Sequence, residues 1–185
     1  MLERLKETLI KAPVVKFGDY KYFVHPVTDG VPELPPALLE EIVDEIVKIA
    51  DLDCDRLVTA EAMGIPITTA LSLKTGLPFT IIRKREYRLP GEIKVDQETG
   101  YSKGAMSING VIKGDRVVFI DVVLSTGGTL RAIALALRSM GAVLKDIVIV
   151  VEKGEGKAAL EKELGARIKT LVKVAIVDGK VKIID

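Results

Sequence analysis

A short apolar run, an acid and a glycine-rich turn form the part of the sequence best suited to chemistry. Residues 117–120 are all apolar and predict a buried strand that ends on Asp121, after which the chain turns into a helix. Two glycines let the backbone approach a ligand, and the N–H groups at the helix start attract an anion. The turn consists of Ser125, Thr126, Gly127, Gly128 and Thr129. This pattern predicts a phosphate site.

Other phosphate-binding patterns do not fit this turn. No lysine follows its glycines, as a Walker loop requires, and the GxGxxG spacing of dinucleotide-binding folds is absent. Taken alone, the turn also suits an ordinary strand-to-helix connection, because Gly and Thr are common at helix starts. A phosphate of the mononucleotide type is the better fit.

A second strand-turn-helix segment offers another anion site. A strand predicted over residues 56–60 is followed by a helix over residues 65–74, which begins with Ile65 and Pro66. The turn between them holds Glu61, Ala62, Met63 and Gly64. An ordinary turn explains this segment equally well when it is considered alone.

Cations gather after the strand predicted over residues 78–82. They are Arg83, Lys84, Arg85 and Arg88. Such a group suits a polyanion, and a solvated charge run is the alternative. Residues 86–104 then hold charges, glycines and Pro90 without a stable period, and a loop of this length in a compact domain is usually functional.

Lys153 follows an apolar strand predicted over residues 146–152. An ammonium group only donates hydrogen bonds. It can therefore bind a carbonyl oxygen of a ligand but is repelled by a ligand's amino hydrogens. A surface lysine after a strand is the alternative.

Strands and helices alternate along the part of the chain that positions these residues. Continuous apolar strands between helices indicate an α/β fold with a parallel sheet covered on both faces. Ahead of this part, an amphipathic helix with Leu5 and Leu9 precedes a hairpin that turns at Gly18 and Asp19. Further helices are predicted over residues 37–50, 128–140 and 158–164, and further strands over residues 117–121 and 169–174.

Composition excludes several classes of protein. The 185 residues suit one domain, and 27 basic against 26 acidic residues give no reason to expect nucleic acid. With Cys54 the single cysteine and His25 the single histidine, neither an internal disulfide nor a Cys/His zinc site is expected. The apolar runs are too short to span a membrane, and no signal peptide is recognisable, so we expect a cytoplasmic protein.

Together the motifs resemble a known family. The segment VVFIDVVLSTGGT resembles the motif with which phosphoribosyltransferases bind phosphoribosyl pyrophosphate (PRPP), and EAMG is similar to the pyrophosphate loop of the adenine and xanthine enzymes. The run RKREYRLPG resembles the entry to the catalytic loop of adenine enzymes, and VEK resembles the IEK of xanthine enzymes. Over nearly its whole length the chain resembles the archaeal-type hypoxanthine/guanine phosphoribosyltransferases.

That resemblance implies a fold and an activity. The fold is the type I phosphoribosyltransferase fold, a parallel twisted sheet flanked by helices, with a hood mainly over residues 1–35 and a flexible catalytic loop at about 84–106. The activity is transfer of the phosphoribosyl group from PRPP to hypoxanthine or guanine in purine salvage. Mg²⁺ would be carried by PRPP and not bound directly by the protein, and the enzyme would be a homodimer.

The resemblance also implies a role for each candidate residue. It gives the 5-phosphate to the turn from Ser125 to Thr129 and a ribose hydroxyl to Asp121. For pyrophosphate it implies Glu61, Ala62, Met63, Gly64, Arg83, Lys84 and Arg85. For the base it implies Lys153, Phe23 and Val123. The implied catalytic set is Asp121, Glu98, Arg83 and Lys84.

Two positions depart from the family pattern. Val122 stands where the family usually has a second acid that contacts the ribose, and Gly100 stands where adenine enzymes carry a glutamate. Glu98 is the nearest carboxylate, so either Glu98 or water would take the proton of the base. An adenine phosphoribosyltransferase and a PRPP-sensing regulator without catalytic activity are the alternative functions.

Overall fold

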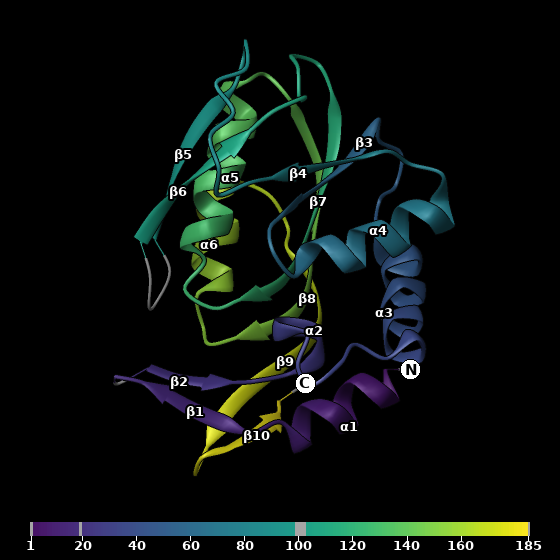
Figure 1. The fold of residues 1–185 in the computed structure, drawn as a ribbon, viewed down its shortest axis with the longest axis vertical. Helices are drawn as coiled ribbons and strands as arrows, with labels where there is room; N and C mark the ends of the chain where they lie inside the picture. Colours follow the sequence, from purple (N-terminus) through teal and green to yellow (C-terminus); the bar gives the residue numbers. More distant parts are fainter. Residues whose placement is uncertain (1, 19, 99–102, 185) are drawn as a thin grey trace.

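The computed structural model describes residues 2–18, 20–98 and 103–184, apart from the side chains of residues 97, 98 and 103, and within this part six strands form a central sheet (Figure 1). The strand order is β10-β9-β8-β7-β3-β4, and neighbours run parallel except β10 with β9. The predicted α/β fold with a parallel sheet is confirmed. The strands are β3 (Arg56–Ala60), β4 (Phe79–Ile82), β7 (Arg116–Leu124), β8 (Val143–Lys153), β9 (Lys169–Val177) and β10 (Lys180–Ile183).

Helices cover both faces of this sheet (Figure 1). On one face Val118 and Ile120 of β7 pack in a core with apolar residues of α1 to α4, and on the other Val117 and Phe119 pack with α5 and α6. Because both faces are covered, β7 and β8 read as nearly continuous apolar runs. The helices are α1 (Glu3–Lys11), α2 (Pro26–Asp29), α3 (Pro36–Ile49), α4 (Gly64–Thr75), α5 (Gly128–Ser139) and α6 (Lys157–Leu164).

The segment expected to be a flexible loop at about 84–106 contains regular structure instead. Strands β5 (Ile93–Glu98) and β6 (Lys103–Ile108) pair antiparallel, with Ile93 opposite Ile108. Val95 and Met106 are buried in the same core as α5, while the neighbouring Asp96 is exposed. In β5 the exposed Lys94 and Asp96 flank Val95, and the sequence analysis did not recognise this alternation, so the prediction of an irregular segment was wrong for these strands.

Other boundaries differ in smaller ways. Strand β7 does not end on Asp121, because its pairing with β8 continues through Val123 and Leu124. The predicted N-terminal hairpin is present as β1 (Val14–Phe17) and β2 (Tyr20–Phe23), although Asp19 at its turn lies outside the described residues. The sequence reading missed the short helix α2 and the strand β10. In the part of the chain that the structure describes, no helix has the length and apolar character to cross a bilayer.

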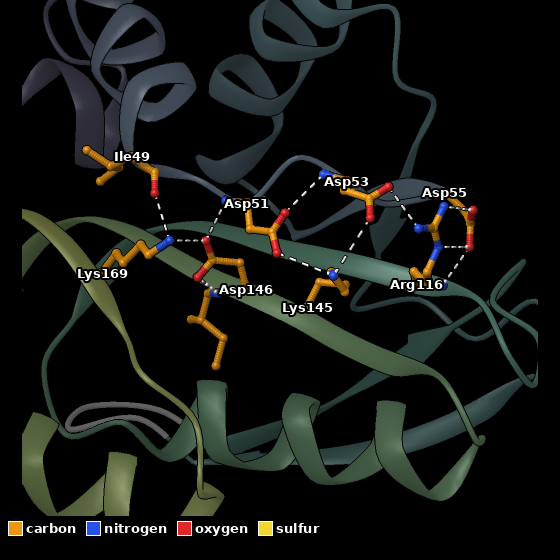
Figure 2. Close-up of polar contacts among 9 residues, drawn as sticks. Ile49, Asp51, Asp53, Asp55, Arg116, Lys145, Asp146 and Lys169 are labelled. Atoms are coloured by element: carbon orange, nitrogen blue, oxygen red, sulfur yellow. Dashed lines mark hydrogen bonds and ion pairs between the residues drawn. The ribbon is translucent and has the colours of Figure 1, made fainter.

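Charged side chains join the amino ends of the parallel strands (Figure 2). The carboxylate of Asp146 accepts hydrogen bonds from the backbone N–H of Asp51 at 2.8 Å and from Lys169 Nζ at 2.6 Å. Lys169 also donates to the carbonyl of Ile49 at 2.7 Å. Since only 5% of the Asp146 side chain is exposed, these donors compensate for its burial and tie α3 to the sheet.

The chain of ion pairs continues along the same edge (Figure 2). Lys145 Nζ lies 3.3 Å from the carboxylate of Asp51, and Arg116 pairs with Asp53 at 2.8 Å and Asp55 at 3.0 Å. The N–H of Asp53, and then Lys145, hold the pKa of Asp51 below its usual value. These outer pairs are largely solvated, so we expect each to contribute less than the Asp146 pair.

Replacing Asp146 with alanine should therefore destabilise the fold. Asp146→Ala is expected to lower the free energy of unfolding by about 2 kcal/mol, because it leaves donors of Asp51 and Lys169 without their buried partner. Urea unfolding followed by circular dichroism measures this loss. Asp53→Ala is the matched control, since its side chain is 71% exposed. Equal losses in both variants would contradict this account of the edge.

Candidate active site

A cavity of about 300 Å³ opens at the carboxyl ends of the parallel strands. The turn after β3, the end of β7, the loop into α5, the end of β8 and the hairpin β1–β2 with α2 all contribute to it. Ligands gather at this edge in α/β folds because neighbouring loops diverge there. The sequence-predicted residues that line it are Phe23, Glu61, Ala62, Met63, Lys84, Asp121, Val123, Ser125, Thr126, Gly127, Gly128, Thr129 and Lys153.

The glycine-rich turn presents the start of α5 to this cavity. Gly127 is the residue before the first helical turn and has φ 79°, a left-handed conformation that favours glycine. A Cβ atom on Gly127 would also approach Leu160 Cδ2 to 2.9 Å. No described side chain caps the first turn of α5, so its N–H groups are available to an anion.

Asp121 places a carboxylate beside this turn. Its Oδ1 accepts the backbone N–H of Val122 at 2.8 Å. Burial raises the pKa of Asp121 to about 6, and the Val122 hydrogen bond opposes that shift. The side chain of Val122 is 3% exposed and packs in the core on the α1–α4 face. The position of the usual second acid therefore contributes apolar packing in this chain.

Gly64 brings the start of α4 close to Asp121. A Cβ atom at Gly64 would stand 3.4 Å from Asp121 Oδ1 and 2.1 Å from Thr59 Oγ1. Thr59 is fully buried on β3, so it has little room to move aside. Gly64 does not line the cavity itself; its role in the structure is to let α4 lie against β3 and β7.

Glu61 organises the cationic segment that follows β4. Its carboxylate lies 2.5 Å from Arg83 Nε and accepts the backbone N–H of Lys84 at 2.9 Å. Arg83 also exchanges backbone hydrogen bonds with Ser107 of β6, at 2.7 and 3.1 Å. Lys84 lines the cavity, whereas Arg83 and Arg85 lie outside its lining. Glu61 thus fixes the backbone that carries these cations.

Lys153 enters the cavity from the end of β8 and is held by the hairpin. Its Nζ donates to the carbonyl of Lys21 at 2.5 Å and lies 3.9 Å from the centroid of the Tyr20 ring. The Tyr20 hydroxyl is 3.1 Å from Ser125 Oγ. Phe23, which is 2% exposed, and Tyr22 both line the cavity, and their ring centroids lie 6.1 Å apart in a stacked arrangement.

Asp29 also lines the cavity, although no pattern in the sequence predicted it as a site residue. Asp29 Oδ1 accepts the Tyr22 hydroxyl at 2.7 Å, and Oδ2 accepts the backbone N–H of His25 at 2.9 Å. His25 is buried and accepts the N–H of Val27, which caps α2, and burial lowers its pKa to about 4. Pro26 after this cap and Gly30 after Asp29 were the available signal for a short helix. Glu98 is described in β5 only as backbone, and its side chain lies outside the described residues.

Comparison with known proteins defines the class to which this fold and site belong. A model of the phosphoribosyl transferase domain matches residues 37–179. An adenine phosphoribosyltransferase structure from Thermoanaerobacter pseudethanolicus has a TM-score of 0.73 at 22% identity, covering 94% of this chain and 99% of that one. One from Trypanosoma brucei has a TM-score of 0.74 at 20% identity, covering 93% and 79%. The chain therefore belongs to the phosphoribosyltransferase family. At 20–22% identity, the two solved structures support the assignment of the fold alone.

Curated relatives specify the branch of that family. A protein of Methanocaldococcus jannaschii named hypoxanthine/guanine phosphoribosyltransferase is 58% identical over 97% of this chain and 99% of its own length. A protein of the same name from Methanococcus vannielii is 53% identical over the full length of both chains. The chain is therefore a relative of the archaeal hypoxanthine/guanine phosphoribosyltransferases, and the resemblance inferred from its sequence is confirmed.

The pKa of Asp121 predicts a pH-dependent effect of its replacement. At about pH 7, Asp121→Asn should raise the free energy of unfolding by about 1–3 kcal/mol, because a desolvated charge is removed while an oxygen remains for the Val122 N–H. The folded pKa of about 6 lies above the ordinary 3.8, so wild-type stability falls as pH rises between these values. The advantage of the variant should disappear below about pH 4. Urea unfolding across this range tests it, and a gain that does not vary with pH would refute it.

Gly64→Ala tests the close approach of α4 to β3. The added methyl group would overlap Thr59 Oγ1, and such overpacking should cost about 1–3 kcal/mol of unfolding free energy. Thr59→Ala in the same chain removes that oxygen and should restore much of the loss. A double-mutant cycle of thermal unfolding measures this coupling. Additive effects of the two changes would show that the contact is not the cause.

Proposed function

We propose that this protein transfers the 5-phosphoribosyl group of PRPP to hypoxanthine or guanine, releasing pyrophosphate and forming IMP or GMP in purine salvage. The observation that carries the proposal is the meeting, in one cavity, of the α5 anion site, the Asp121 carboxylate and the Lys153 ammonium. These groups suit a phosphate, a ribose and a 6-oxopurine in turn. The names of the archaeal relatives favour the same reaction.

The proposed binding of PRPP follows from the lining of the cavity. The N–H groups at the start of α5 and the hydroxyls of Ser125, Thr126 and Thr129 would bind the 5-phosphate. Asp121 would accept hydrogen bonds from ribose hydroxyls, which would offset the desolvation of its carboxylate. Pyrophosphate would lie against Ala62, Met63 and Lys84.

The cationic segment would act when pyrophosphate departs. Charge develops on that leaving group, and fixed cations stabilise it most when they need no rearrangement. Glu61 supplies this fixity through its contacts with Arg83 and the backbone of Lys84. In this proposal Glu61 is a positioning residue, because an acid facing pyrophosphate directly would repel it.

Mg²⁺ is proposed to enter the site bound to PRPP. Among the described residues, no group of three or more His, Cys, Asp or Glu side chains could hold a metal ion. Mg²⁺ usually keeps several waters and binds through substrate phosphates, so an ion carried by PRPP needs no direct ligand from the protein. When bound, the ion would stabilise negative charge on the leaving pyrophosphate.

The remaining assignments are proposals drawn from the family resemblance. Glu98 or water would take the proton of the base, and Val123 and Phe23 would provide apolar contact to the purine. Residues 1–35 would form the hood over the base. Arg85 would contribute to the binding of pyrophosphate. The protein would be a homodimer located in the cytoplasm.

An assay of base preference tests the function. With PRPP and Mg²⁺, hypoxanthine and guanine should be converted to their nucleotides much faster than adenine, because the Lys153 ammonium can only donate. Chromatography of IMP, GMP and AMP measures the three rates. Lys153→Met should remove most of the preference, whereas Lys21→Met, on the neighbouring hairpin, should retain it. Faster conversion of adenine by the wild type would refute the proposal and favour an adenine enzyme.

A further inference from the structure

We infer that Tyr20 is a positioning residue that holds the Lys153 ammonium at the base end of the cavity and ties this end to the phosphate turn. The inference rests on the proposed function, in which Lys153 discriminates between purines. Tyr20, a residue of the N-terminal hairpin, would then contribute to the preference for 6-oxopurines over adenine, which the proposed function assigns to Lys153 alone.

The first observation is the geometry around the ammonium. Lys153 Nζ lies 3.9 Å from the centroid of the Tyr20 ring, within the range of a cation–π interaction. On the same hairpin the carbonyl of Lys21 accepts a hydrogen bond from this Nζ at 2.5 Å. A lysine side chain has many rotamers, and two contacts at its terminal atom restrict them.

The second observation is the place of these side chains between two cavities. Tyr20 and Lys153 line both the cavity described above and a neighbouring one of about 370 Å³. The carboxylate of Glu155, which lies 3.0 Å from Lys173 Nζ, belongs to a residue that lines the second cavity. Without the Tyr20 ring, the Lys153 ammonium would be free to turn towards that carboxylate and away from the base.

The third observation connects the two ends of the substrate site. The Tyr20 hydroxyl lies 3.1 Å from Ser125 Oγ, although the two residues are 105 positions apart in the chain. One side chain thus contacts a residue proposed to bind the 5-phosphate and another proposed to read the base. The hydroxyl links the hairpin to the phosphate turn, and the ring restrains the ammonium.

Separate variants distinguish the ring from the hydroxyl. Tyr20→Leu removes both, and it should lower the ratio of kcat/KM for hypoxanthine over adenine by about tenfold, mainly through a higher KM for hypoxanthine. Tyr20→Phe retains the ring and should keep this ratio within about twofold of the wild type. Phe17→Leu is the matched control, because Phe17 is the cross-strand partner of Tyr20 but lines neither cavity.

A spectroscopic measurement reports the contact without catalysis. In an NMR spectrum, the methylene protons at the end of a lysine side chain that lies above an aromatic ring are shifted upfield. The signal of these Lys153 protons can be assigned with Lys153→Arg, and it should be shifted upfield in the wild type, Tyr20→Phe and Phe17→Leu. It should return to the ordinary position in Tyr20→Leu. Thermal unfolding of each variant identifies any that does not fold.

The outcomes separate this inference from the proposed function. If the wild type shows no preference for 6-oxopurines, the proposed function fails. If the wild type shows it and Tyr20→Leu keeps both the preference and the shifted signal, the role of Tyr20 is refuted. A loss of preference as large in Phe17→Leu as in Tyr20→Leu would also refute it, because the effect would then belong to the hairpin as a whole.

Discussion

The parallel pairing of β3, β7 and β8 is the constraint on which the rest of the structure depends. Parallel strands place their carboxyl ends at one edge of the sheet. The segments after Ala60, Leu124 and Lys153 therefore lie close together at this edge. Helices cover both faces of the paired β7, which leaves Asp121 partly desolvated beside the start of α5. The exposed start of α5 at the cavity, the raised pKa of Asp121 and the position of Lys153 in the cavity all follow from this arrangement.

The opposite edge of the sheet serves stability. There, charged groups are paired across elements, as Asp146 is with Lys169 and Arg116 with Asp53 and Asp55. Because these charges are paired within the protein, they are satisfied without a ligand. The two edges therefore have different roles. The edge with the strand amino ends fixes the register of the strands, and the edge with the carboxyl ends presents polar groups that a substrate can contact.

Local patterns predicted the sheet, the helices and the anion turn, because each depends on residues close together in sequence. The apolar run at residues 117–120 predicts a buried strand by itself, and the glycines at 127 and 128 predict a turn. Strand β5 was missed because the charged residues Lys94 and Asp96 flank Val95, and β6 was missed because Met106 stands between the small residues Ala105 and Ser107. The contacts of Tyr20 with Ser125 and Lys153, and of Asp29 with Tyr22, join distant segments, and no spacing rule indicates them.

These distant contacts share a feature that bears on substrate binding. Polar groups at the site have protein partners: Glu61 contacts Arg83, the Tyr20 ring and the Lys21 carbonyl contact Lys153, and Tyr22 donates to Asp29. A buried polar group without a partner costs free energy, so these contacts stabilise the polar side chains at the site. They also mean that a substrate exchanges one set of partners for another. A base that offers Lys153 no acceptor would have nothing to exchange for the Tyr20 and Lys21 contacts, and discrimination would arise from what the protein gives up as well as from what it gains.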